Sequence, residues 1–285
     1  GPTKEAPMPE FTVPGDTPVT LHYTDSGGEG RPVVLIHGWP LSGAAWAGQI
    51  EALEASGYRA IAYDRRGFGA SDKPEDGYDY DTLASDLNEL ILGLDLTDAV
   101  LVGFSMGGGE VARYLGTYGS GRLAGAVLAA SVTPCLRLEE GNPDGAMPQE
   151  AFDALADQCA ADRPGFLDGF LHTFFSSAQG GLTVTEAQVA EAAAIAAQGS
   201  DAALPACIRI WPTDFRADLE ACDVPLLVIH GDGDQNVPFA KSAARVQQYA
   251  PDAELHVVAD GPHGINVSHA EEFNAALLDF LAGLR

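Results

Sequence analysis

A serine stands where a buried strand is expected to turn sharply into a helix. The β-branched run before it leads into Gly103-Phe-Ser105-Met-Gly107. This spacing is typical of a nucleophile elbow, a turn that lifts a serine hydroxyl off the end of a strand. The turn crowds the backbone so tightly that positions 103 and 107 admit only glycine. The pattern therefore indicates Ser105 as a nucleophile, and a serine that merely caps the following helix is the alternative.

An acid follows a later strand. Residues 224–231 are almost wholly apolar and predict a buried strand, and the loop Asp232-Gly-Asp234-Gln-Asn-Val237-Pro238 comes next. Asp234 lies further into this loop, with Val237 and Pro238 fixing the chain behind it, so we expect it to orient a histidine. We expect Asp232 to form a turn, because an aspartate flanked by glycines commonly bonds its own backbone.

A histidine follows the last predicted strand, in the loop Asp260-Gly-Pro-His263-Gly264. His263 completes the chain order serine, acid, histidine, in which each residue comes after a different strand. A solvated surface histidine is the alternative, and His269, near the start of the last helix, is the second candidate. Four other histidines are expected to pack rather than react: His22, His172, His230 and His256.

Two backbone N–H groups could stabilise an oxyanion. Met106, the residue after the nucleophile, supplies one through the geometry of the turn. The loop Leu35-Ile-His-Gly-Trp39-Pro40 follows an early strand and supplies the other. We assign that donor to Trp39, because Pro40 has no N–H. Trp39 is also expected as a core aromatic, and both roles are compatible.

Strands and helices alternate along most of the chain, and this predicts a mostly parallel, twisted sheet covered by helices on both faces, an α/β fold. Catalytic residues in such sheets lie at the carboxyl ends of the strands. The expected strands are residues 19–24, 33–36, 59–63, 100–104, 125–130, 226–230 and 254–258.

Residues 132–215 break this alternation and are expected to form a helical cap, with the core made of residues 10–131 and 216–285. Residues 1–9 are expected to be flexible, and Gly1-Pro2 is expected to be a tag remnant. The predicted cap helices, with no strand between them, are residues 148–161, 164–175, 185–198 and 201–208. An apolar pocket is expected beneath the cap, although the cap aromatics could simply pack together. Its candidate residues are Phe104, Val132, Phe170, Phe174, Trp211 and Ile265.

Composition bears on partners and location. The formal net charge of −26, from 41 acidic and 15 basic residues, argues against nucleic acid or an anionic membrane as a partner. The four cysteines have no metal-ligand spacing and are expected to be reduced, buried thiols. The chain has no long apolar stretch and no start resembling a signal peptide, so we expect a cytoplasmic protein.

These motifs together resemble the α/β-hydrolase superfamily, and most closely its cofactor-free haloperoxidase and arylesterase group of serine hydrolases. The resemblance extends from about residue 11 to the end of the chain. It implies Ser105 as nucleophile, His263 as general base and acid, and Asp234 as its partner. It also implies Trp39 and Met106 as oxyanion donors. The motifs that carry it include His37-Gly-Trp-Pro-Leu41, Tyr63-Asp-Arg-Arg-Gly-Phe-Gly69, Val102-Gly-Phe-Ser-Met-Gly107, Asn142-Pro-Asp-Gly145, Thr213-Asp-Phe-Arg-Ala-Asp218 and Gly261-Pro-His-Gly264.

The resemblance implies hydrolysis of small aryl or alkyl esters through an acyl-enzyme, with no metal or organic cofactor. It also implies that hydrogen peroxide can intercept the acyl-enzyme to give a peracid, which oxidises halide in solution. The Trp39 carbonyl, which precedes a proline whose peptide bond can be cis, is a candidate partner for the peroxide. Tyr63 to Gly69 is expected to be a structural turn in which Asp64 and Arg65 bond local backbone.

Several alternatives remain open from the sequence. A lactonase, an amidase or a carbon–carbon bond hydrolase would use the same three residues, and a small-ligand receptor could share the fold. Dehalogenases and epoxide hydrolases of this fold use an aspartate at the elbow, and the serine at position 105 disfavours both. A homo-oligomer is compatible with the sequence.

Overall fold

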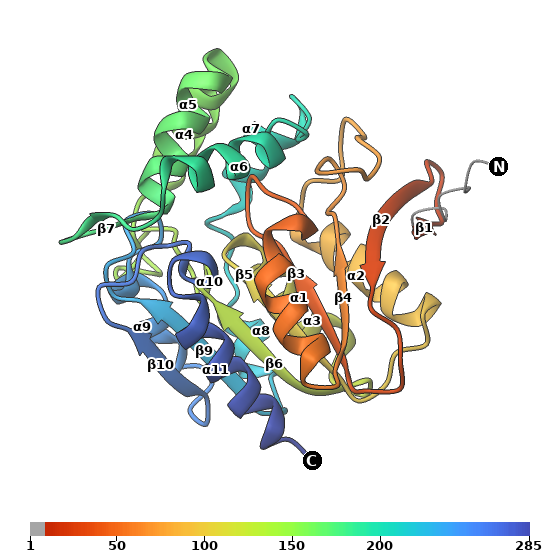
Figure 1. Cartoon of the computed structure of the whole chain (residues 1–285). Helices are drawn as coiled ribbons and strands as arrows, with labels where there is room; N and C mark the ends of the chain where they lie inside the picture. Colours follow the sequence, from red (N-terminus) through yellow and green to blue (C-terminus); the bar gives the residue numbers. More distant parts are fainter. Residues whose placement is uncertain (1–8) are drawn as a thin grey trace.

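An eight-stranded sheet runs through the computed structural model, which describes residues 9–285 (Figure 1). The strand order is β1-β2-β4-β3-β5-β6-β9-β10. All neighbouring pairs from β4 to β10 are parallel, whereas β2 runs antiparallel to β1 and to β4. The predicted α/β class with a mostly parallel sheet is confirmed, and β1 is a strand that the sequence did not predict. The strands are β1 (Glu10–Val13), β2 (Val19–Asp25), β3 (Pro32–Ile36), β4 (Arg59–Tyr63), β5 (Ala99–Phe104), β6 (Leu123–Ala129), β9 (Leu226–Gly231) and β10 (Glu254–Val258).

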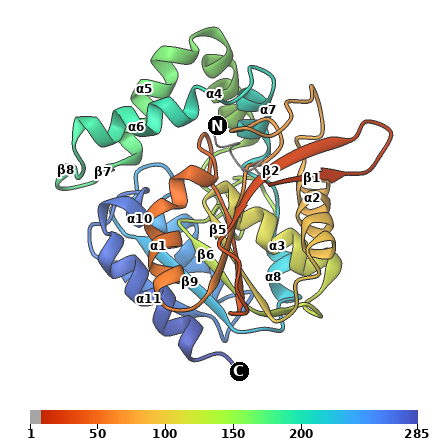
Figure 2. The ribbon, with the colours of Figure 1, turned by 45° about the vertical axis from the view of Figure 1, so that its right-hand side comes forward.

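Helices cover both faces of the sheet (Figures 1 and 2). The central strand β5 is buried along its whole length, which agrees with its unbroken apolar sequence. On one face lie α1 (Ala47–Ala55), α10 (Ile265–Ser268) and α11 (Ala270–Ala282), and on the other α2 (Tyr80–Gly93), α3 (Met106–Tyr118) and α8 (Arg216–Glu220). The short elements η1 (Gly43–Trp46), η2 (Phe239–Lys241) and α9 (Ala243–Val246) lie within connecting segments.

Four helices sit together beyond the sheet, as the green to cyan ribbons of Figures 1 and 2 show. The sequence provides their start signals: Asp162 caps the second helix, and Thr185 with Gln188 forms a capping box on the third. The expectation of no strand in this region is wrong, because a ribbon of two-residue strands joins the second and third helices. Strands this short leave no alternating pattern in the sequence. The elements are α4 (Gln149–Ala161), α5 (Arg163–Phe174), β7 (Ser176–Ser177), β8 (Gly181–Leu182), α6 (Glu186–Ala196) and α7 (Ala203–Ile210).

Two further points concern the N-terminal segment and membrane-spanning helices. The predicted flexible segment 1–9 and the tag remnant Gly1-Pro2 lie outside the described residues, apart from Pro9. Among residues 9–285, none of the helices combines the length and the apolar character that crossing a bilayer requires.

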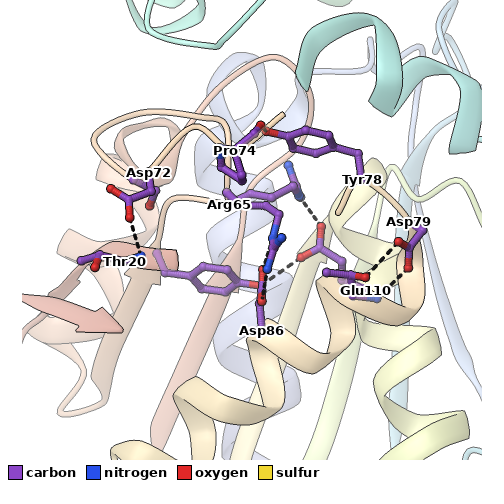
Figure 3. Close-up of polar contacts among 12 residues, drawn as sticks. Thr20, Arg65, Asp72, Pro74, Tyr78, Asp79, Asp86 and Glu110 are labelled. Atoms are coloured by element: carbon purple, nitrogen blue, oxygen red, sulfur yellow. Dashed lines mark hydrogen bonds and ion pairs between the residues drawn. The ribbon is translucent and has the colours of Figure 1, made fainter. Parts of the chain in front are cut away.

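The turn after β4 is partly as predicted. The Asp64 carboxylate accepts the backbone N–H of Ala70 at 2.8 Å, which is the expected local bond, and also that of Gly43, 21 residues before it, at 2.9 Å. The expectation for Arg65 was too local. Its side chain donates to the His37 carbonyl. It also reaches Glu110 on α3, and both of these residues are labelled in the close-up of Figure 3.

Candidate active site

Ser105 lies between β5 and α3 in a backbone conformation that side chains rarely adopt. Its φ is 54° and its ψ is −113°. A Cβ at position 103 would lie 2.7 Å from Gly108 N, and one at position 107 would collide with the Ile36 carbonyl oxygen. Both glycines are therefore required by close approach of the backbone, as the sequence indicated.

We expect Gly107→Ala to lower the free energy of unfolding by about 1–3 kcal/mol, because the added methyl group has no room beside β3. The measurement is the urea unfolding midpoint. Gly48→Ala on α1 is the matched control, since a Cβ there meets nothing within 4 Å. The control should be neutral or slightly stabilising because alanine favours helix. Equal midpoints for the two variants would contradict this packing argument.

Three side chains from separate strand ends form a continuous hydrogen-bonded chain. His263 Nε2 lies 2.9 Å from Ser105 Oγ, and His263 Nδ1 lies 2.7 Å from Asp234 Oδ2. All three residues are buried. The imidazole is held by aromatic rings, with centroid distances of 5.1 Å to Phe104 and 4.8 Å to Phe174. The structure thus brings together the three residues predicted to act jointly.

The two oxygens of Asp234 have separate partners. Oδ1 accepts the backbone N–H groups of Asn236 at 2.9 Å and Val237 at 2.8 Å, which leaves Oδ2 directed at His263. Burial raises the pKa of Asp234, but the charge and hydrogen bond of His263 and the close contact with His230 outweigh it. The pKa of Asp234 therefore falls below its ordinary value. The carboxylate stays ionised beside the imidazole.

His230 is a contact of Asp234 that the sequence analysis missed. It is fully buried, as expected of a packing histidine, but its Nε2 lies 2.9 Å from Val237 O and 3.3 Å from Asp234 Oδ2. A ring N–H there donates to the carbonyl and faces the carboxylate. The only sequence signal was the spacing of four residues between His230 at the strand end and Asp234 in the loop.

Other predicted side chains have different roles from those expected. Asp232 does not bond its own turn. Its Oδ1 accepts the Asp260 N–H at 2.6 Å, which connects the loop after β9 to the loop after β10. The second candidate base, His269, lies 2.7 Å from Ser268 Oγ. The packing prediction is wrong for two partly exposed histidines, because their rings contact surface carboxylates. His172 contacts Glu186, and His256 contacts Glu272.

The two candidate oxyanion donors are the residue after Ser105 and a residue of the early loop. Met106 is the first residue of α3, so its N–H precedes the hydrogen-bond ladder of the helix. The Trp39 N–H makes no hydrogen bond to another residue within 9–285. A Cβ on Gly38 would lie 2.8 Å from Phe104 Cδ1 and 3.2 Å from Ser105 Cβ. The early loop therefore abuts the elbow.

The Trp39 side chain is buried among cap aromatics. Its ring meets Phe166, Phe170 and Trp211 edge to face, with centroid distances of 4.8–5.9 Å. Its indole N–H donates to Leu204 O on α7 at 3.0 Å. The Trp39–Pro40 peptide bond is cis. The contact between its carbonyl and a peroxide stays a prediction.

A cavity of about 700 Å³ opens onto Ser105 and His263. Three of the predicted pocket residues line it, namely Val132, Phe170 and Trp211, and Phe166 joins them. Phe104, Phe174 and Ile265 do not line the cavity. All three are buried, and the two phenylalanine rings pack against the imidazole of His263.

Part of the cavity wall was not predicted. It comes from the irregular segment before α4, from α4 itself and from the loop after Asp234. Apart from His263, Lys241 is the one ionisable residue among those that line the cavity. The additional lining residues include Leu136, Met147, Phe152, Leu155, Val237 and Lys241.

The four cysteines are all unbridged. Cys135, Cys159 and Cys207 are buried as predicted, and Cys222 is only partly buried. Burial raises the pKa of Cys207 to about 12, so its thiol keeps its proton. In the part of the chain that the structure describes, no three His, Cys, Asp or Glu side chains are grouped to hold a metal ion.

A model of the α/β-hydrolase fold matches residues 31–270. The chain belongs to this family. This α/β-hydrolase is 45% identical over 266 residues to a non-heme chloroperoxidase of Kitasatospora aureofaciens, with 92% of this chain and 96% of that protein covered. It is 36% identical to a bifunctional esterase/perhydrolase of Acinetobacter calcoaceticus, with 92% and 96% covered. A crystal structure of a bromoperoxidase from Bacillus anthracis matches with a TM-score of 0.91 at 44% identity, covering 96% of this chain and 100% of that one. The resemblance drawn from the motifs is confirmed.

Proposed function

We propose that this α/β-hydrolase is a serine esterase that acts on small carboxylic esters and also transfers their acyl group to hydrogen peroxide. The observation that carries the proposal is the chain from Ser105 through His263 to Asp234, with contacts of 2.9 and 2.7 Å, opening into a cavity large enough for an ester. The related esterase/perhydrolase and haloperoxidases support it.

The first half-reaction forms an acyl-enzyme. Ser105 Oγ attacks the ester carbonyl carbon while its proton passes to His263 Nε2. Asp234 keeps the proton on Nδ1 and stabilises the imidazolium. The negative charge on the carbonyl oxygen faces the N–H groups of Trp39 and Met106. The carbon–oxygen bond to the alcohol then breaks, and the alcohol leaves with the proton from His263.

The second half-reaction restores the serine. Water loses a proton to His263 and attacks the acyl carbon, so that a carboxylic acid is released and Ser105 regains its proton. Hydrogen peroxide entering in place of water gives a peracid by the same steps. The peracid transfers its terminal OH oxygen with the proton to a halide ion in solution, which forms hypohalous acid and leaves the carboxylate anion. Halide oxidation thus needs no site for halide on the protein.

The cavity favours an apolar substrate. Its walls are mainly aliphatic and aromatic side chains, among them Phe170, Trp211, Leu136 and Met147. Burying an apolar acyl or aryl group there contributes about 25 cal/mol for each Å² removed from water. We therefore assign aryl and alkyl esters with neutral, apolar groups as the substrate class.

The test is a panel of aryl esters from acetyl to decanoyl, with lactones and amides alongside, assayed with and without hydrogen peroxide. We expect hydrolysis of the esters, and peracid with halide oxidation only when peroxide and an acyl donor are both present. Turnover confined to lactones or amides would reject the ester assignment. A chain that turns over nothing and resists covalent labelling by a fluorophosphonate would reject the whole proposal.

A further inference from the structure

A buried ion pair lies behind the candidate oxyanion hole. Arg65 Nε contacts Glu110 Oε1, and both side chains are 1% exposed. Tyr63 OH donates to the other Glu110 oxygen at 2.9 Å. Figure 3 shows Glu110 reaching from α3 toward Arg65, which lies in the turn after β4. Neither side chain lines the active-site cavity.

The same arginine also holds the early loop. Its Nη2 donates to the His37 carbonyl oxygen at 2.6 Å, and its backbone N–H donates to His37 Nε2 at 2.9 Å. Burial and the charge of Arg65 lower the pKa of His37 well below its ordinary value, so the ring is neutral and can accept. Arg65 therefore fixes both the main chain and the side chain of His37.

The contacts from Glu110 through Arg65 to His37 connect the two segments that carry the oxyanion donors. Glu110 lies one helical turn beyond Met106 on α3, and His37 lies two residues before Trp39. We propose that the Arg65–Glu110 pair is a positioning element of the oxyanion hole, which sets the separation between the N–H groups of Met106 and Trp39. This proposal rests on the esterase function proposed above.

The physical reason is that oxyanion donors act through preorganisation. A donor displaced by about 1 Å from the developing charge can cost about 100-fold in rate. The loop from His37 to Trp39 has no helical or sheet ladder of its own, so the arginine supplies what a regular element would otherwise provide. Loss of this link should harm the transition state more than the bound substrate.

The chain contains a matched control in the next residue. Arg66 and Asp86 on α2 form a two-pronged pair with contacts of 2.7 and 2.8 Å, and their side chains are 9% and 5% exposed. Arg66 makes no hydrogen bond to His37. Arg65, Glu110 and Asp86 are labelled in Figure 3. Both are buried arginine–carboxylate pairs, but only Arg65 also bonds His37.

The test compares Arg65→Lys with Arg66→Lys. Lysine keeps the charge opposite each carboxylate but has one compact ammonium in place of the fork that bridges two partners. We expect Arg65→Lys to lower kcat for an aryl ester about 10- to 100-fold with KM unchanged. Inhibition by phenylboronic acid, whose adduct with serine places an oxygen at the oxyanion position, should weaken in parallel. Arg66→Lys should leave all three quantities within about twofold of wild type.

A second pair of variants covers failure to fold. Arg65→Met with Glu110→Leu and Arg66→Met with Asp86→Leu each replace a buried pair by apolar side chains, an exchange that is often tolerated. Matching thermal midpoints with a selective loss of kcat and boronate affinity in the first variant would support the proposal. Equal kcat and boronate affinity in both would overturn it. A wild-type chain without esterase activity or boronate binding would instead overturn the function on which it rests.

Discussion

Ser105→Ala is expected to lower kcat for aryl esters about a million-fold, because the attacking oxygen is removed and, within residues 9–285, no other hydroxyl or thiol is hydrogen-bonded to His263 Nε2. Peracid formation and halide oxidation should disappear with it, since both depend on the same acyl-enzyme. Parallel assays of ester hydrolysis and peroxide-dependent halide oxidation check this. Halide oxidation that survives in Ser105→Ala would point to a separate peroxide chemistry.

Ser131→Ala is the matched control for this experiment. Ser131 is also a buried core serine, but its hydroxyl pairs with Thr133 Oγ1 at 2.8 Å and contacts no histidine. A fluorophosphonate should label wild type and Ser131→Ala and leave Ser105→Ala unmodified, which intact mass measures directly. Labelling of Ser105→Ala at another residue would contradict the assignment of the nucleophile.

Asp234→Asn is expected to lower kcat about 10⁴-fold with little change in KM. In the variant, the amide oxygen keeps the two backbone N–H bonds now made by Oδ1, so the amide NH₂ faces His263. It then donates to Nδ1 and places the ring proton on Nε2, toward Ser105. A ring in that tautomer cannot accept the serine proton.

Asp232→Asn controls for the loss of a loop carboxylate. The Asp232 carboxylate accepts the backbone N–H of Asp260, and an asparagine oxygen at the same place keeps that bond. Its kcat should stay close to that of wild type. Comparable losses in the two variants would mean that loop integrity, rather than the tautomer of His263, governs turnover.

The lowered pKa of Asp234 also makes stability depend on pH. A carboxylate whose pKa is lower in the folded chain stabilises it fully above the unfolded value, which is ordinarily 3.8. That contribution is lost as the pH falls below this value toward the folded one. Urea titrations from pH 5 downward should therefore show a shallower loss of stability for Asp234→Asn than for wild type.

The catalytic candidates were predictable because local patterns determine their positions. Glycine spacing indicates the Ser105 turn, and apolar runs indicate the strands that end before Asp234 and His263. Parallel pairing then carries these ends to one edge of the sheet. The hydrogen-bond distances among the three side chains required coordinates.

The rest of the site depends on contacts that produce no periodic pattern in the sequence. The cavity lining includes Leu136 and Met147, which come from a segment without regular helix or strand and so follow no periodic pattern. Arg65 was expected to bond local backbone, yet its main partner, Glu110, lies on a helix 45 residues further along the chain. Likewise, His230 lies at the end of an apolar strand, and this pattern indicates packing rather than a contact with Asp234.

Trp39 has a consequence for how this enzyme can change. Its main chain carries a proposed oxyanion donor, while its indole ring packs among cap aromatics and bonds Leu204 on α7. A substitution at position 39 would therefore change substrate selectivity and turnover together. A lineage that adapts to a new acyl group would gain more freedom by altering Leu136 or Met147, which also line the cavity, than by exchanging this tryptophan.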